Sequence, residues 1–239
     1  MEHVETGSPE PGPIYLEPTW YFDYDTPSVR EFALSRTAGR ETQVAKAVAL
    51  FYAIRDEIRY DPYTISDDRA DYRASRVLEA GAAFCVPKGN LLVACARALG
   101  IHAGLGLSDV TNHLCTERLL KLMGGSNLFI HHGYAVLRLD GRWIKAAATF
   151  NLELCEKFDV LPTEFDGTEH ALFQEFDSLG RRHMEYIRDH GVWSDFDFDR
   201  VIGDFRDLYP DTLFEDCATE RARNAARQAA RFEDERPVV

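Results

Sequence analysis

Cys85 has the strongest case for chemistry of any residue in the chain. It precedes an apolar run, residues 87–99, that ends at Gly100. Pro87 suits the first turn of a helix, where its missing N–H costs nothing, and a run that is apolar nearly all round is typical of a buried helix. Cys85 is therefore expected at the N-terminus of a buried helix. There the helix dipole and free N–H groups stabilise a thiolate and can hold an oxyanion.

A thiol nucleophile also needs a base. Among the histidines, His131 and His132 open a predicted strand that runs to about residue 139, and the Asp140-Gly141 pair predicts a two-residue turn into a return strand from 142 to about 149. This register places Thr149 opposite His132, with Ala147 and Asn151 as diagonal neighbours. A residue that orients His132 is therefore expected at position 147, 149 or 151.

Along the chain, a cysteine at a helix start is followed by a histidine that opens a strand and then by a hairpin return. This order resembles the transglutaminase-like superfamily, which shares the papain-like Cys-His-Asp arrangement. The similar blocks are FCVPKGNLL at 84–92 with CARALGIHA at 95–103, HGYAVLRLDGRWIK at 132–145, and SRVLEAG at 75–81. The resemblance as a whole covers about residues 44–151. The resemblance implies an α+β fold with a transglutaminase-like, papain-like core. In that core a buried central helix, starting at the cysteine, packs on an antiparallel sheet, and C-terminal helices are added.

One position departs from the family pattern. The family's Asp aligns with Ala147, whose side chain has no acceptor. Papain-like enzymes can use Asn instead, so Asn151 is expected as the third catalytic residue beside Cys85 and His132, with Thr149 as its rival. Asn151 could alternatively cap a helix that begins near Leu152, and the site could be a two-residue pair or inactive.

The expected reaction is acyl transfer. Cys85 attacks an amide or ester carbonyl of a small molecule or peptide, and the resulting thioester is resolved by water, as in an amidase or peptidase, or by an amine, as in a transamidase. The alternative is a catalytically inactive binding module with the same fold. Metal binding through His131, His132, His102 and Asp109 has no support from their spacing, so neither a metal nor a cofactor is expected.

Composition narrows the partners and the compartment. The 239-residue chain has a formal net charge of −13, which disfavours binding to nucleic acid. Its five cysteines include no CxxC pair, so a disulfide framework or structural zinc site is not expected. The sequence contains no run of 18 apolar residues, so no membrane span is predicted. Its acidic, proline-rich start does not resemble a secretory signal, so a cytoplasmic protein is expected.

Three regions are expected along the chain. Residues 1–27, with five prolines, form an extended N-terminal arm; residues 28–160 form the catalytic core; and residues 161–239 form a mainly helical extension packed on that core. Periodicity predicts helices at 41–60 and 75–80 and a strand at 101–108. Further helices are expected near 112–123, 178–190, 198–208 and 212–232.

Overall fold

A five-stranded antiparallel sheet forms the centre of the protein in the computed structural model, which describes residues 1, 3–4, 7–226 and 231–238. The strand order is β1-β7-β4-β5-β6, and each neighbouring pair is antiparallel. The bounds are β1 (His3–Val4), β7 (Met184–Trp193), β4 (Ala103–Asn112), β5 (Leu128–Leu139) and β6 (Arg142–Ala146). Two further short strands, β2 (Arg59–Tyr60) and β3 (Ala82–Ala83), pair in parallel outside this sheet.

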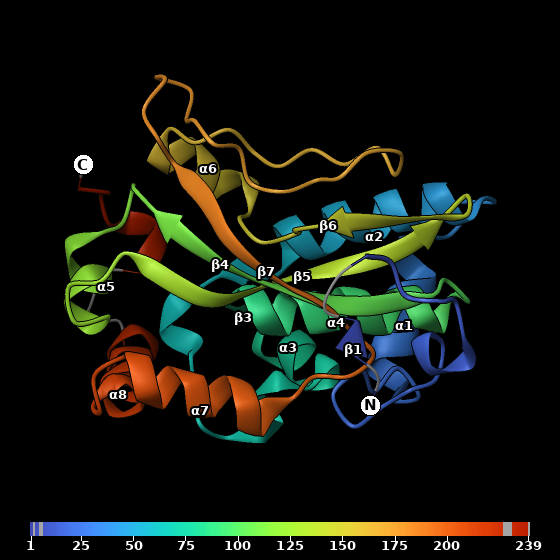
Figure 1. Cartoon of the computed structure of the whole chain (residues 1–239), viewed down its shortest axis with the longest axis horizontal. Helices are drawn as coiled ribbons and strands as arrows, with labels where there is room; N and C mark the ends of the chain where they lie inside the picture. The colour runs from blue at the N-terminus through green and yellow to red at the C-terminus, as the bar shows by residue number, and fades with distance from the viewer. Residues whose placement is uncertain (2, 5–6, 227–230, 239) are drawn as a thin grey trace.

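Helix α4 (Cys85–Ala98) lies against one face of the sheet and is buried from Val86 to Arg97. Its contact with the sheet is close: a Cβ added to Gly89 would lie 3.1 Å from Leu105 Cδ1 on β4. Three helices pack against α4 in turn: α1 (Pro27–Arg36), α2 (Gln43–Glu57) and α3 (Ala74–Ala80). Figure 1 shows α4 in the middle of the molecule, with β5 and β6 above it and α3 below it. The expected α+β fold, with a buried central helix starting at Cys85 on an antiparallel sheet, is confirmed.

The C-terminal part contains helices but also a central strand. The helices that follow β4 in the chain are α5 (Glu117–Leu122), α6 (Leu152–Phe158), α7 (Phe198–Leu208) and α8 (Leu213–Ala225), and α7 has the expected bounds. The helix expected at 178–190 is wrong, because this segment leads into β7, between β1 and β4. Its register against β4 shifts twice. Burial along β7 therefore does not alternate with the period that identifies a strand in a sequence.

Both ends of the chain return to the core. In the N-terminal arm, β1 pairs with β7 and Tyr15 is fully buried. Near the other end, Val238 N–H donates to the carbonyl of Cys115 at 2.8 Å. Short 3-10 helices complete the fold: η1 (Pro13–Tyr15), η2 (Pro62–Thr64), η3 (Arg69–Tyr72) and η4 (Phe232–Asp234). None of the helices within the described residues has both the length and the apolar character needed to cross a bilayer.

Candidate active site

Cys85 is the first residue of α4. The preceding residue, Phe84, has an extended backbone (φ −82°, ψ −174°), so the chain turns sharply into the helix at the cysteine. Pro87 lies in the first turn, where its ring is compatible with the helix and no hydrogen bond is lost. Cys85 is partly exposed, whereas the other four cysteines are buried: Cys95, Cys115, Cys155 and Cys217. The structure therefore gives Cys85 both the helix terminus and the accessibility that a nucleophile needs.

Two opposing effects set the pKa of the Cys85 thiol. Burial raises it, and the backbone N–H groups of Gly133, Val86 and Cys85 lower it, which leaves a pKa of about 11. Burial raises the pKa of Cys115, Cys155 and Cys217 to about 12 and that of Cys95 further still. Cys85 is thus a neutral thiol in this closed state, yet it is the cysteine that loses its proton most readily.

Gly133 allows β5 to approach the start of α4. A Cβ at this position would lie 2.6 Å from Val86 Cα and 3.1 Å from Val86 N. Atoms at such distances overlap, so a residue with any side chain would push β5 away from the helix terminus. The same close approach brings the Gly133 N–H to the sulfur of Cys85. Sequence reasoning missed this role, although the position of a glycine directly after the candidate base is a usable signal.

His132 lies on β5 and is 4% exposed. Its ring packs beside Phe173, with centroids 5.0 Å apart, and beside Tyr186 at 6.1 Å. Its Nε2 is buried and has no hydrogen-bond partner among the described residues. Burial lowers the pKa of His132 to about 3. The imidazole is therefore neutral at physiological pH and has a nitrogen free to accept a proton.

Cys85 and His132 line one small enclosed cavity of about 30 Å³, which is room for about one water molecule. No hydrogen bond joins their side chains in the part of the chain that the structure describes. The remaining walls come from β2, from the end of α5, from the start of β5 and from α7; they include Tyr60, Met123, Phe129, Ile130, His131, Phe205 and Tyr209. The cavity is mostly apolar and too small for a substrate, so entry of a substrate requires one of these walls to move.

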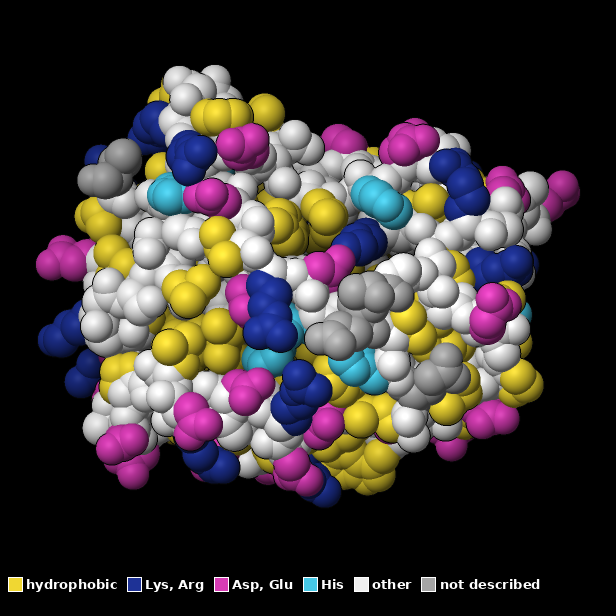
Figure 2. Space-filling model, viewed as in Figure 1, with side chains coloured by type: hydrophobic (Ala, Val, Ile, Leu, Met, Phe, Trp, Pro, Cys, Tyr) yellow, Lys and Arg dark blue, Asp and Glu magenta, His cyan; other side chains and the backbone are white. Residues whose placement is uncertain are grey.

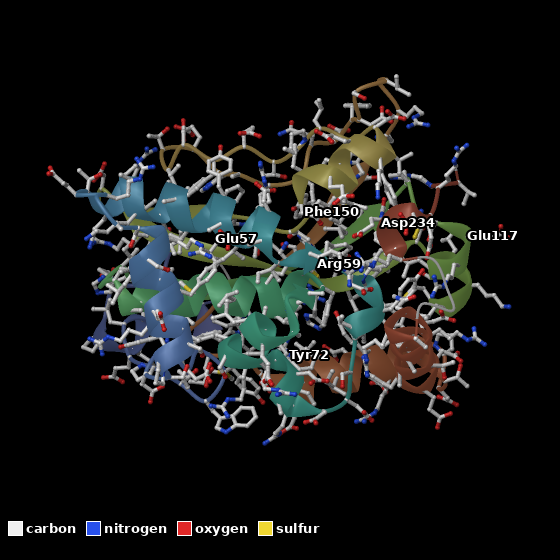
Figure 3. The ribbon with its side chains drawn as sticks, turned by 180° about the vertical axis from the view of Figure 1, so that it is seen from behind. Glu57, Arg59, Tyr72, Glu117, Phe150 and Asp234 are labelled. Carbon is white, nitrogen blue, oxygen red and sulfur yellow. The ribbon has the colours of Figure 1, made fainter. Side chains whose placement is uncertain are left out.

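A row of aromatic rings connects the cavity wall to His132. Tyr60 contacts Phe150 with centroids 4.7 Å apart, Phe150 contacts Phe173 at 4.5 Å, and Phe173 contacts His132. Figure 3, viewed from behind, labels Phe150 near Arg59, where the chain between β6 and α6 passes the end of α2. These rings exclude water from the imidazole, which is the physical cause of its lowered pKa.

The hairpin has the expected register, but it ends early. Pairs from Leu139↔Arg142 to Ala135↔Ala146 follow the predicted pattern. Pairing with β5 stops at residue 146 rather than near 149. On the edge of β6 that faces away from β5, the N–H of Ala147 donates to the carbonyl of Ala171 at 2.8 Å. Thr149 is buried but does not pair with β5.

Asn151 is buried at the entrance to α6. Its side-chain oxygen Oδ1 accepts a hydrogen bond from the Tyr60 backbone N–H at 3.0 Å. The residue occupies the N-cap position of α6, but its side chain makes no capping hydrogen bond. The capping alternative is thus not supported. Asn151 connects β2 to α6, and its orienting role toward His132 stays a prediction.

Lys88, one turn along α4, is a buried charge that the sequence did not point out. It is 1% exposed, and its Nζ donates to the carbonyls of Arg55 at 3.0 Å and Ile58 at 2.5 Å, at the end of α2. Burial lowers its pKa to about 7. The amine fixes α2 against the helix that carries the nucleophile.

Comparison with known proteins identifies the core. The model of the transglutaminase-like superfamily matches residues 30–148, which contain Cys85 and His132. Among solved structures, a putative cysteine protease from Cytophaga hutchinsonii is similar, with 17% identity and a TM-score of 0.44 over 77% of this chain and 56% of that chain. A putative protease from Parabacteroides distasonis has 17% identity and a TM-score of 0.37 over 51% and 23% of the two chains. The chain thus spans about half or less of the length of these structures. No curated protein matches the sequence.

Proposed function

Because residues 30–148 form a domain of the transglutaminase-like superfamily, we propose that this protein is a cysteine-dependent acyl-transfer enzyme. Cys85 is its nucleophile and His132 its base. The observation that carries the proposal is the environment of the sulfur: a partly exposed thiol at a helix N-terminus, approached by the backbone N–H of Gly133, in the same cavity as a neutral imidazole.

In the first step, His132 takes the proton of the Cys85 thiol as the sulfur attacks an amide or ester carbonyl. Since both groups are neutral in the closed state, the proton moves during the attack. The carbonyl oxygen becomes an oxyanion, which backbone N–H groups at the start of α4 are placed to stabilise.

In the second step, the imidazolium returns its proton to the leaving amine or alcohol, and a thioester remains on Cys85. Water or a second amine then attacks the thioester, with His132 again accepting a proton. Water makes the protein an amidase or peptidase, and an amine makes it a transamidase. A peptide or a small molecule with an amide or ester group is the substrate class.

Two observations favour a second candidate, an inactive binding module with this fold. Ala147 has no acceptor where the family has Asp, and the closed cavity holds only about one water. The two candidates differ in one property, which is whether Cys85 forms a covalent acyl adduct.

Mass spectrometry of the intact chain and of its peptides tests this. The protein is incubated with p-nitrophenyl acetate and with a panel of peptide amides, then quenched in acid. Acylation of Cys85, absent in Cys85→Ser and much slower in His132→Asn, is the expected result. No acylation of Cys85 by any member of the panel, with the protein shown to be folded, favours the binding module.

A further inference from the structure

His131 lines the cavity of Cys85 and also a second pocket, where it lies with other side chains that can bind a metal ion. Asp109 on β4, His131 on β5 and His190 on β7 each offer a donor atom, and these atoms all lie within 4.8 Å of one another. They line a surface pocket of about 350 Å³ together with Asp204 of α7. Figure 2 shows histidine side chains among acidic and basic ones near the centre of this face. Asp109, His131 and His190 lie far apart along the chain, so their spacing in the sequence did not indicate a metal site.

Hydrogen bonds hold this group in place. His190 Nε2 lies 2.7 Å from Asp109 Oδ1, and His131 Nε2 lies 2.6 Å from Asp204 Oδ2. The backbone N–H of His131 also donates to Asp109 Oδ1 at 3.1 Å. His131 is 2% exposed, and its Nδ1 is buried with no hydrogen-bond partner among the described residues. A buried, unpartnered imidazole nitrogen is costly, and at His131, unlike His183, it lies in a residue grouped with two further donors.

The backbone of the central strands is irregular at these residues. The pairing of β4 with β5 shifts between Ser108 and Val110, and its pairing with β7 shifts between Asp109 and Val110. On β5, His131 has φ +55°, in the left-handed region that a residue with a side chain seldom adopts. Bulges and strained residues redirect side chains and cluster at functional sites. Here they turn side chains from neighbouring strands toward one point.

We propose that Asp109, His131 and His190 bind one divalent transition-metal ion of the Zn²⁺ class. Two imidazoles and a carboxylate are donors that such ions prefer. Because the Asp204 carboxylate holds His131 Nε2, Nδ1 is the nitrogen left to serve as donor, in the usual carboxylate–histidine–metal arrangement.

The distances need only small adjustments. Bonds to Zn²⁺ of about 2.0–2.1 Å place two tetrahedral donors about 3.3 Å apart. The distance of 2.7 Å between His190 Nε2 and Asp109 Oδ1 must therefore increase slightly, and any donor pair that is farther apart than about 3.3 Å must move closer. Side-chain rotation achieves both. The charge balance favours a cation, because three carboxylates, those of Asp109, Asp204 and Asp207, line the pocket against the one guanidinium of Arg188 among the described residues.

The test is direct metal binding by the full chain. Cys85→Ser is used as the parent so that the accessible thiol cannot act as a ligand. After treatment with EDTA and its removal, Co²⁺ binding is followed by visible absorption, and Zn²⁺ binding by calorimetry and displacement of Co²⁺. We expect one ion per chain. His190→Asn and Asp109→Asn should each weaken binding at least 100-fold, and Asp204→Asn by about 10–100-fold, as is typical of a residue that orients a ligand.

His183→Asn is the matched control. His183 is also 2% exposed and its buried Nδ1 also has no partner within the described part of the chain, but it is not a member of the cluster. This variant should bind the ion as the parent does. Circular dichroism checks the fold of each variant. If His190→Asn does not fold, the metal affinities of Asp109→Asn and of Asp204→Asn, whose original side chain is only half-buried, test the site. Absence of saturable 1:1 binding in the parent, or equal binding in the parent and the cluster variants, overturns the proposal. Buried His–Asp pairs would then serve only to stabilise the fold.

Discussion

Replacing Gly133 with alanine tests whether the close approach of β5 to α4 builds the site. The added methyl would lie 2.6 Å from Val86 Cα, 3.0 Å from its Cγ2 and 3.1 Å from its N. Carbon atoms in contact are normally about 3.5–4.0 Å apart, so the strand and the helix must separate by roughly 1 Å. Two of the three atoms belong to the backbone, so a side-chain rotation cannot relieve the overlap.

The expected cost follows from two effects. Overpacking of a buried site destabilises by about 1–3 kcal/mol, while the loss of glycine's freedom in the unfolded chain restores about 0.4–1 kcal/mol. Gly133→Ala should therefore lower the free energy of unfolding by about 1–2 kcal/mol, measured by urea denaturation. Because Gly133 N–H stabilises the Cys85 thiolate, the variant should also react more slowly with iodoacetamide at that thiol.

Gly203→Ala is the matched control. Gly203 is inside α7, and a Cβ there would meet no atom within 4 Å. This substitution should increase stability by about 0.5–1 kcal/mol through helix propensity. If Gly133→Ala is as stable as the original protein while Gly203→Ala behaves as expected, the inferred steric constraint is wrong.

Four further predictions concern the site. In the folded protein, iodoacetamide should label Cys85 before any other cysteine, as read by peptide mass spectrometry, because Cys85 is partly exposed while the other four cysteines are buried, and because its thiol pKa is the least raised; faster labelling elsewhere would contradict this. Burial lowers the pKa of His132 from 6.5 to about 3, so below pH 6.5 His132 binds a proton in the unfolded chain but not in the folded one. This difference lowers the free energy of unfolding by about 2 kcal/mol at pH 5. His132→Asn should lose correspondingly less stability between pH 7 and 5, and an equal loss would count against a buried neutral imidazole. For Lys88, whose pKa burial lowers to about 7, the sign is the same but the pH window is higher: between pH 7 and about 10.4 the unfolded amine holds a proton that the folded one lacks. The free energy of unfolding should therefore rise with pH in this window, and Lys88→Met should abolish that part of the rise in urea midpoints. Asn151→Ala should greatly reduce turnover if Asn151 orients His132, whereas a purely structural role costs about 1 kcal/mol for the lost bond to Tyr60 with turnover preserved; unchanged turnover there together with loss in Thr149→Val would transfer the role to Thr149.

The sequence determined the parts of this protein that depend on local patterns. An apolar run between Pro87 and Gly100 can only be a buried helix, so the position of Cys85 at its start followed directly. The Asp140-Gly141 turn specified the hairpin, because a two-residue turn fixes every pair that follows it. Helix α7 was also located correctly, because its apolar residues repeat with the helical period, which is again a local pattern.

Tertiary structure decided what depends on contacts between distant segments. β7 becomes a strand through pairing with β4, and the outer edge of β6 pairs with Ala171, which is distant along the chain. The cluster of Asp109, His131 and His190 exists only because neighbouring strands are irregular at the same place. The thiol of Cys85 illustrates the general reason. The sequence showed the helix terminus that lowers its pKa, but the burial that outweighs this effect comes from segments far along the chain, whose packing no local pattern encodes.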